Sequence, residues 1–254
     1  MTTRQRLLTI IIIFLTAFFT TSCATTNWEQ RKDQGASLRN VGEVHMKEGN
    51  YRTALREFQK AQALYADDHL LHNDLGLTYF ALGRLDLSID HFEKALELKP
   101  DFPAAKNNLG SAYFQQKKFD KAIEAFKELG GDLLYATPYY PLSNLGEVYL
   151  EKKEYHLAEK NFKAALKIEP RFARALRGLG KTYMATGRIT EAVQILEKAV
   201  KNAPRFAALY LDLGKAYVIA REYKKALSAY NKVVELAPDS DLAQKAAAEA
   251  DRIR

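Results

Sequence analysis

The sequence predicts an all-α protein, a solenoid of six helix pairs followed by a C-terminal helix. Three observations predict it. Glycine recurs at intervals of 34 or 36 residues, each of these glycines follows an aliphatic residue, and Ala, Leu, Lys and Glu dominate while long Val/Ile/Thr alternations are missing. The 254 residues are 47% hydrophobic and 27% charged, which is typical of a folded protein rather than a disordered one.

The first 22 residues are expected to lie outside that fold. MTTRQRLLTIIIIFLTAFFTTS begins with Arg4 and Arg6 and continues with an apolar run from Leu7 to Phe19. A charged start followed by a short apolar run is typical of a secretory signal peptide, and the run is shorter than the about 20 residues that a membrane span needs. We therefore expect residues 1–22 to be the cleaved leader of an exported protein.

Cys23, the only cysteine, follows this run directly. Thr20-Thr21-Ser22-Cys23 resembles the bacterial lipobox, and that resemblance implies a covalent diacylglycerol and an acyl chain such as palmitate on Cys23, with residues 23–34 as a lipidated tether. The alternative is an incidental cysteine behind an ordinary signal or an uncleaved anchor. By resemblance to enterobacterial lipoprotein sorting, Ala24 rather than aspartate implies the periplasmic face of the outer membrane.

The repeat is the strongest pattern in the chain. The glycines are Gly42, Gly76, Gly110, Gly146, Gly180 and Gly214; an aromatic ring follows three residues later, a small residue twelve later and a large residue sixteen later. Proline ends four of the six units. This pattern resembles the tetratricopeptide (TPR) repeat, which implies a right-handed superhelix with a concave groove. The predicted repeats are residues 35–68, 69–102, 103–138 with a two-residue expansion, 139–172, 173–206 and 207–238.

Each conserved spacing has a physical interpretation within an antiparallel helix pair. The glycine and the small residue twelve positions later are expected on facing helices, where short side chains permit close approach. The large residues fill the remaining space, because no unit can cover its own apolar stripe. After the last repeat, residues 239–254 begin with a capping Asp or Ser and are rich in Ala and charge. We expect a helix there that shields the last repeat.

The sequence offers no constellation for catalysis, so we expect a protein that is not an enzyme. It contains no G-x-S-x-G, phosphate-loop or HExxH motif, and the single cysteine is the lipidation candidate. His69 and His72 form the one close histidine pair, which lacks further ligands for a metal and is interpreted as a groove or surface pair. Beyond the lipid on Cys23 we therefore expect no cofactor and no metal.

Charge adds little about partners. Of the 38 Lys and Arg, two lie in the leader, so 36 remain against 31 Asp and Glu. This modest excess suits an acidic partner or an anionic lipid surface, and export argues against nucleic acid.

Binding of a partner protein is expected on the exposed face of the first helix of each repeat, where TPR arrays form their groove. With each repeat glycine as position 8, positions 5, 9 and 12 give an apolar track, two asparagines and a basic cluster. The predicted groove residues are Met46, Asn73, Leu77, Phe80, Asn107, Phe114, Leu150, Arg177, Lys181, Met184 and Lys215. Asparagine amides bind peptide backbone and cations bind a carboxylate. The alternative is that the apolar residues are partly core between repeats and the charges a solvated surface.

The regular pattern is interrupted once, in LGGDLLYATPYYPLSNLG from Leu129 to Gly146. Gly130 and Gly131 predict an early end to the second helix of repeat 3, and Pro141 suits the first turn of the next helix. The intervening junction loop carries Asp132, Leu133, Leu134 and Tyr135. We expect Leu133, Leu134 and Tyr135 to pack under the array.

This junction is similar to that of the type IV pilus biogenesis and stability lipoproteins, the pilotins, which have Asp-x-Leu-Tyr-Pro followed by Asn-Leu-Gly. Here the matching residues are Asp132-Leu133-Leu134-Tyr135-Ala136 and Asn144-Leu145-Gly146, with Ala136 in place of the proline. The resemblance implies a protein that binds the pilus secretin subunit and promotes its outer-membrane localisation and ring assembly. The alternative function is a TPR lipoprotein scaffold for other envelope machinery, such as murein hydrolases.

Overall fold

A computed structural model of the chain describes residues 27–130 and 137–253. Within those ranges the chain forms thirteen helices and no strand, which confirms the predicted all-α repeat fold. Cys23 and the junction residues Asp132, Leu133, Leu134 and Tyr135 lie outside the described residues. The first helix spans residues 27–47 and so begins inside the segment 23–34 that we expected to be a tether.

The later helices alternate between 13 and 14 residues in most repeats. They are α2 (Tyr51–Leu64), α3 (His69–Ala81), α4 (Leu85–Leu98), α5 (Pro103–Gln115), α6 (Phe119–Gly130), α7 (Tyr139–Glu151), α8 (Tyr155–Ile168), α9 (Ala173–Ala185), α10 (Ile189–Asn202), α11 (Ala207–Ile219), α12 (Tyr223–Leu236) and α13 (Asp241–Asp251). None of these described helices is long and apolar enough to cross a membrane.

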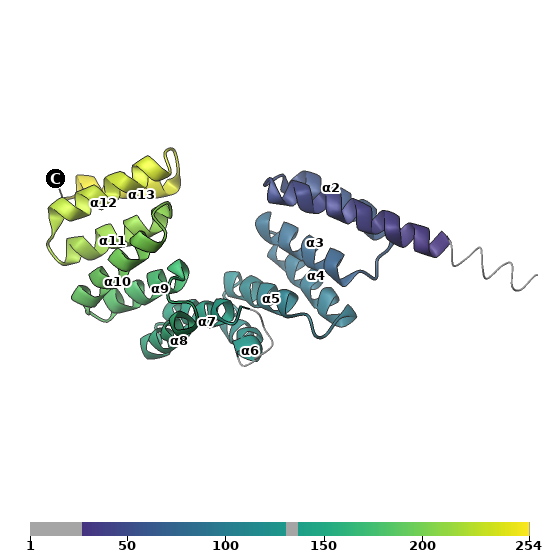
Figure 1. The fold of residues 1–254 in the computed structure, drawn as a ribbon, viewed down its shortest axis with the longest axis horizontal. Helices are drawn as coiled ribbons and strands as arrows, with labels where there is room; N and C mark the ends of the chain where they lie inside the picture. Colours follow the sequence, from purple (N-terminus) through teal and green to yellow (C-terminus); the bar gives the residue numbers. More distant parts are fainter. Residues whose placement is uncertain (1–26, 131–136, 254) are drawn as a thin grey trace, which may run out of the picture. The chain divides into compact units, whose positions relative to one another are not determined.

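The chain divides into two compact units, unit 1 (residues 1–112) and unit 2 (residues 113–254). In both, consecutive helices pair, as in α3 with α4 and α9 with α10 (Figure 1). We call the first helix of each pair helix A and the second helix B. Burial of apolar side chains between the pairs supplies the core: Phe58, Leu71 and Leu75 in unit 1, and Leu196, Tyr230 and Val233 in unit 2.

Each helix A ends in the same hydrogen-bonded turn. In repeat 1 the N–H of Gly49 donates to the Met46 carbonyl at 3.0 Å and the N–H of Asn50 donates to the His45 carbonyl at 2.8 Å, which is a Schellman motif. The residue at the Gly49 position has a positive φ in all six repeats. It is Gly49, Gly83, Lys117, Lys153, Gly187 or Arg221.

Four repeat glycines face the ring of the residue sixteen positions later, namely Gly42, Gly76, Gly146 and Gly214, and Gly180 faces Leu196 in the same way. A Cβ built on Gly146 would lie 2.6 Å from Cε1 of Phe162, and a Cβ on Gly178 would also overlap that ring. Phe162 is fully buried, so one ring is enclosed between a glycine of α7 and a glycine of α9. The small residue twelve positions later also faces helix A, since the Ser88 hydroxyl donates to the Gly76 carbonyl at 2.8 Å.

Polar side chains join neighbouring A helices at a fixed spacing of 35 residues. The Arg177 guanidinium contacts the Asp212 carboxylate at 2.6 Å, and the Asn108 amide donates to the Asn73 side-chain oxygen at 2.9 Å. We call these pairs the A-helix ladder. The same spacing relates Ser143 to Gly178, which has no side chain, and the buried Ser143 hydroxyl has no partner among the described residues.

The first rung of the ladder, from Arg39 to Asp74, is not closed. Arg39 contacts Glu43 and Asp68 instead, each at 3.6 Å, and one oxygen of the buried Asp74 carboxylate has no hydrogen-bond partner in the described part of the chain. Burial raises the pKa of Asp74 to about 7, the Glu43 charge adds to the rise, and Arg39 opposes it.

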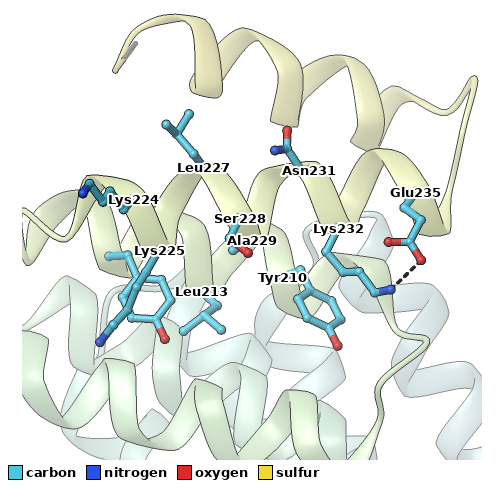
Figure 2. A pocket seen from close by; sticks show the side chains of 11 residues that line it. Tyr210, Leu213, Lys224, Lys225, Leu227, Ser228, Ala229, Asn231, Lys232 and Glu235 are labelled. Atoms are coloured by element: carbon cyan, nitrogen blue, oxygen red, sulfur yellow. Dashed lines mark hydrogen bonds and ion pairs between the residues drawn. The ribbon is translucent and has the colours of Figure 1, made fainter.

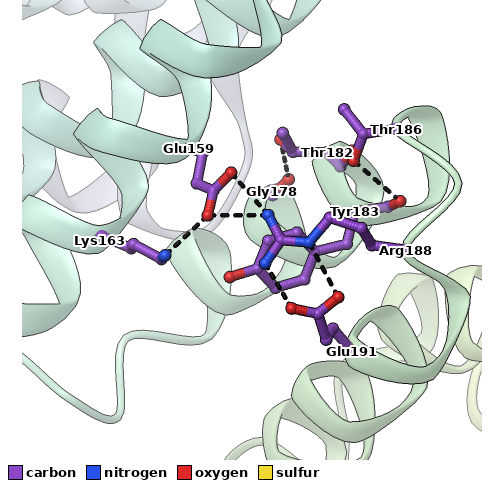
Figure 3. Close-up of polar contacts among 8 residues, drawn as sticks. All are labelled: Glu159, Lys163, Gly178, Thr182, Tyr183, Thr186, Arg188 and Glu191. Atoms are coloured by element: carbon purple, nitrogen blue, oxygen red, sulfur yellow. Dashed lines mark hydrogen bonds and ion pairs between the residues drawn. The ribbon is translucent and has the colours of Figure 1, made fainter.

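An ion-pair cluster joins repeats 4 and 5 (Figure 3). Arg188 donates to both carboxylate oxygens of Glu159 at 2.9 and 3.1 Å and also pairs with Glu191, while Lys163 contacts Glu159 at 2.7 Å. The guanidinium lies 4.0 Å from the centroid of the Tyr183 ring. The hydrogen bonds that Arg188 donates to the Glu191 and Glu159 carboxylates raise its pKa, so it stays protonated.

The C-terminal helix appears as predicted. Helix α6 is described as far as Gly130, and residues 131–136, on which the predicted interruption falls, lie outside the described residues; Pro141 lies in the first turn of α7. Helix α13 begins after Ser240, whose hydroxyl accepts from the Ala243 N–H at 3.1 Å. Its buried residues Ala243, Ala246 and Ala250 cover the last repeat.

Candidate functional site

The candidate site is a cleft of about 230 Å³ in unit 2, on the A helices of repeats 4 and 5. Helix α7 contributes one leucine and two glutamates to the lining, and α9 contributes two arginines, a lysine and a glycine. Two phenylalanines complete it, Phe114 near the end of α5 and Phe206 just before α11. The lining residues are Phe114, Glu147, Leu150, Glu151, Arg174, Arg177, Gly178, Lys181 and Phe206. Apolar side chains and charges of both signs therefore share one concavity.

Most of the charges in the cleft already have partners. Arg177 contacts the buried Asp212 through the A-helix ladder, and its guanidinium carbon lies 5.9 Å from the Phe206 ring centroid. Arg174 contacts Glu147 at 3.6 Å. Lys181 is half-buried and makes no ion pair within the described ranges. It is therefore the cation in this cleft that is available to an incoming carboxylate.

Four predicted groove residues meet in this cleft, namely Phe114, Leu150, Arg177 and Lys181. They do so because positions 5, 9 and 12 of neighbouring A helices project on the same side of the stack. Met184 packs instead against the hydrophobic core of the last repeats, and Lys215 is exposed on α11 outside the cleft. The prediction of partner binding by these residues stays a prediction.

The predicted groove residues of unit 1 are partly used inside the fold. Met46 packs on the core around Phe58, and its sulfur accepts from the Thr78 hydroxyl at 3.7 Å. Asn73 is buried, with its side-chain oxygen bonded to Asn108. Leu77, Phe80 and Asn107 are half-buried, and the Asn107 carbonyl accepts a hydrogen bond from the Ser111 hydroxyl at 2.9 Å. The alternative that part of the apolar track is core between repeats therefore applies to Met46.

Four lining residues were missed by the sequence reasoning. They lie outside the set 5, 9 and 12: Glu151 is at position 13 of its repeat, and Arg174, Gly178 and Phe206 are at positions 2, 6 and 34 of theirs. The partner of Arg177 was also missed, although the spacing of 35 residues to Asp212 recurs between Asn73 and Asn108. That recurrence was the signal available in the sequence.

A larger hollow of about 730 Å³ lies on α11 and α12 (Figure 2). Its lysines and tyrosines are largely engaged: Lys232 contacts Glu235 at 2.5 Å, Lys225 pairs with Glu222, and the Tyr217 hydroxyl donates to Glu197 at 2.6 Å. It contains none of the predicted groove residues.

Two of the histidines, the buried His72 and the half-buried His91, contact each other. His72 faces His91 with their Nδ1 atoms 2.9 Å apart, and Nε2 of His72 lies 3.0 Å from the Ala66 carbonyl. Burial lowers the pKa of both rings, that of His91 to about 4. His69 packs edge-on against Phe102 and not into this pair. In the described part of the chain no three His, Cys, Asp or Glu side chains gather as metal ligands do.

Stacked helix pairs with a concave cleft on their A helices define the chain as an α-helical repeat scaffold, a class whose concave surfaces bind other proteins. More specifically, it is a tetratricopeptide repeat protein. Family models described as TPR repeat or tetratricopeptide repeat match residues 76–117, 108–131, 149–209 and 180–241. A search of proteins with curated functions found no significant match.

Solved structures with similar folds include two pilus proteins. PilW, described as a widely conserved type IV pilus biogenesis factor, is 22% identical with a TM-score of 0.73 over 83% of this chain and 96% of PilW. Pseudomonas aeruginosa PilF is 20% identical with a TM-score of 0.69 over 87% of this chain and 99% of PilF. A chain of the APC/C hetero-tetramer Cut9–Hcn1 also has a TM-score of 0.73, at 17% identity over 87% of this chain and 42% of that chain. At these identities the likeness shows the fold.

Proposed function

We propose that this chain is a lipid-anchored TPR protein of the outer membrane that binds the secretin subunit of a type IV pilus and promotes secretin localisation and ring assembly. The observation that carries this proposal is the structural alignment with the two pilus proteins, which covers 96% of the PilW chain and 99% of the PilF chain. The resemblance of the junction around Asp132 and Tyr135 to the pilotin family points the same way.

The cleft on α7 and α9 suits a short segment of the partner. Its volume of about 230 Å³ accommodates one large apolar side chain, which would contact Phe114, Leu150 and Phe206. Lys181 lies at the same cleft and would pair with a carboxylate of the segment. We propose that the bound segment presents an apolar residue next to an acidic one.

The binding proposal is tested by capture of secretin from solubilised envelopes. We expect the parent chain to capture secretin, and Leu150→Glu and Lys181→Glu each to reduce capture at least about tenfold, because each opposes one of the two contacts. The matched control is Lys167→Ala, an exposed residue on helix α8 outside the cleft. Equal capture by all four proteins would contradict the role of the cleft. Capture of a murein hydrolase in place of secretin would favour the scaffold alternative.

The role in assembly and the anchor need separate tests. In a deletion strain we expect secretin monomers away from the outer membrane and no surface pili; normal heat-stable secretin multimers would contradict the proposal. A Cys23→Ser chain should be released into the periplasm, because three acyl chains supply the anchoring free energy. Finding that variant still in the outer membrane would exclude the lipid as the anchor.

A further inference from the structure

A third concavity of unit 2 is formed by two turns that each join a helix A to its helix B. It has a volume of about 460 Å³ and lies between the turn from α5 to α6 and the turn from α7 to α8. Its lining residues are Lys117, Lys118, Phe119, Asp120, Lys121 and Lys152. Four of these six residues are lysine, and we call the concavity the lysine turn cleft.

The lysine turn cleft keeps an excess of positive charge after its internal ion pairs are counted. Lys152 contacts Asp120 at 3.2 Å and Glu154 at 3.3 Å, so its charge is balanced. Lys121 lies 5.1 Å from the Tyr113 ring centroid and has no carboxylate partner among the described residues. Lys117 and Lys118 are exposed, and neither side chain has a partner in the described part of the chain.

Backbone conformation gives an independent indication. The Schellman turn that ends each helix A requires a positive φ, and repeats 1, 2 and 5 meet this requirement with glycine. Repeats 3, 4 and 6 instead use Lys117 at φ 60°, Lys153 at φ 61° and Arg221 at φ 62°. A left-handed conformation is unfavourable for a residue with a Cβ, so three cations occupy positions where glycine is better for stability. Such strain is expected where the side chain has a function.

We propose that the lysine turn cleft binds the phosphate group of anionic phospholipid headgroups at a membrane surface. Lys117 and Lys118 are exposed on the turn from α5 to α6, so both ammonium groups are accessible to headgroups. Lysine ammonium groups on flexible stems bind phosphates as point charges, and about 1 kcal/mol per lysine is typical of anionic membranes. The half-buried Phe119 ring adds an apolar contact at the headgroup level.

The test uses the chain carrying Cys23→Ser, so that no acyl chain contributes and the outcome does not depend on the anchor or on secretin. We expect it to sediment with vesicles of phosphatidylglycerol and phosphatidylcholine in equal parts, and not with phosphatidylcholine alone, with binding lost at high salt. Lys117→Gly and Lys118→Gln should each weaken binding about fivefold at about 0.1 M salt. Lys167→Ala, which removes an exposed lysine of helix α8 outside the cleft, should leave it unchanged.

The melting temperature of Lys117→Gly is measured as well, because this substitution removes the cation and also the backbone strain of a positive φ. We expect its melting temperature to be equal to or higher than that of the parent, so weaker binding cannot come from unfolding. Equal vesicle binding by Lys117→Gly, Lys118→Gln and the parent would overturn the proposal. Binding of inorganic phosphate without any binding of vesicles would also overturn the proposal. Tighter binding to polyglutamate than to the vesicles would overturn it too, because that result would indicate an acidic protein segment as the partner.

Discussion

Replacing Gly146 by alanine tests the packing that sets the spacing of helices α7, α8 and α9. The new Cβ would lie 2.6 Å from Cε1 and 2.7 Å from Cδ1 of Phe162, whereas ordinary contact begins at 3.4 Å. The ring must therefore retreat by 0.8 Å, the difference between 3.4 and 2.6 Å. It has no free space to enter, because the ring is fully buried and Gly178 of α9 closes its other side.

The size of the effect follows from two opposing contributions. Overpacking of a core costs about 1–3 kcal/mol, and a ring enclosed on both sides belongs at the upper end. Alanine is better than glycine inside a helix by about 1 kcal/mol. We therefore expect Gly146→Ala to lower the free energy of unfolding by about 2 kcal/mol, which corresponds to a melting temperature lower by roughly 4–8 °C for a protein of this size.

The assay is thermal and urea unfolding followed by far-ultraviolet circular dichroism. Phe162→Leu in the same chain should recover part of the loss, because the shorter side chain leaves room for the new methyl group, and a double-mutant cycle measures that coupling. Gly187→Ala is the control, since Gly187 has a positive φ of 76° and nothing within 4 Å of a Cβ. Its loss should be unaffected by Phe162→Leu. A melting temperature of Gly146→Ala within a degree of the parent, or a coupling energy of about zero, would refute the reasoning.

Three further outcomes are expected. Ser240→Ala should lower the free energy of unfolding by about 1 kcal/mol and speed amide hydrogen exchange in α13 but not in α7, because the Ser240 hydroxyl caps only α13. The same exchange rates in α13 of the variant and of the parent would contradict this expectation. Asp212→Ala should lower the melting temperature more than Asp212→Asn, because asparagine keeps a hydrogen-bond acceptor for Arg177. If neither variant changes the melting temperature, the contact between Arg177 and Asp212 contributes nothing to stability. Because the pKa of His91 is lowered to about 4 and that of His72 also falls, the histidine contribution to the stability of unit 1 should be full above pH of about 6.5 and decline as pH falls toward about 4. Asp74, whose pKa is raised to about 7, contributes with the opposite sign over the same range, so the measurement is the difference between the parent and His91→Gln, followed by fluorescence of Trp28, the only tryptophan; this difference should shrink as pH falls from about 6.5 toward about 4.

The spacing of glycines was enough to predict the helix pairs, because a 34-residue period admits few folds. The cleft was predicted in part: Phe114, Leu150, Arg177 and Lys181 meet because their repeat positions share a face. The pairing of Arg177 with Asp212 could not be inferred from one repeat, since it depends on the offset between neighbouring A helices. Burial of Asn73 against Asn108 depends on that same offset.

Because the A-helix ladder depends on a fixed spacing of 35 residues, the array should tolerate the removal or addition of a whole repeat but not of one or two residues. Removing residues 173–206 would take out one period and place Ser143 opposite Asp212, so that a buried hydroxyl without a partner would gain a carboxylate acceptor. Removing a single residue from the same stretch would instead turn the Arg177 or Asp212 side of the pair by about 100° around its helix. The chain is therefore expected to accept lengthening or shortening by 34 residues, and to resist insertions of one or two residues inside a helix A.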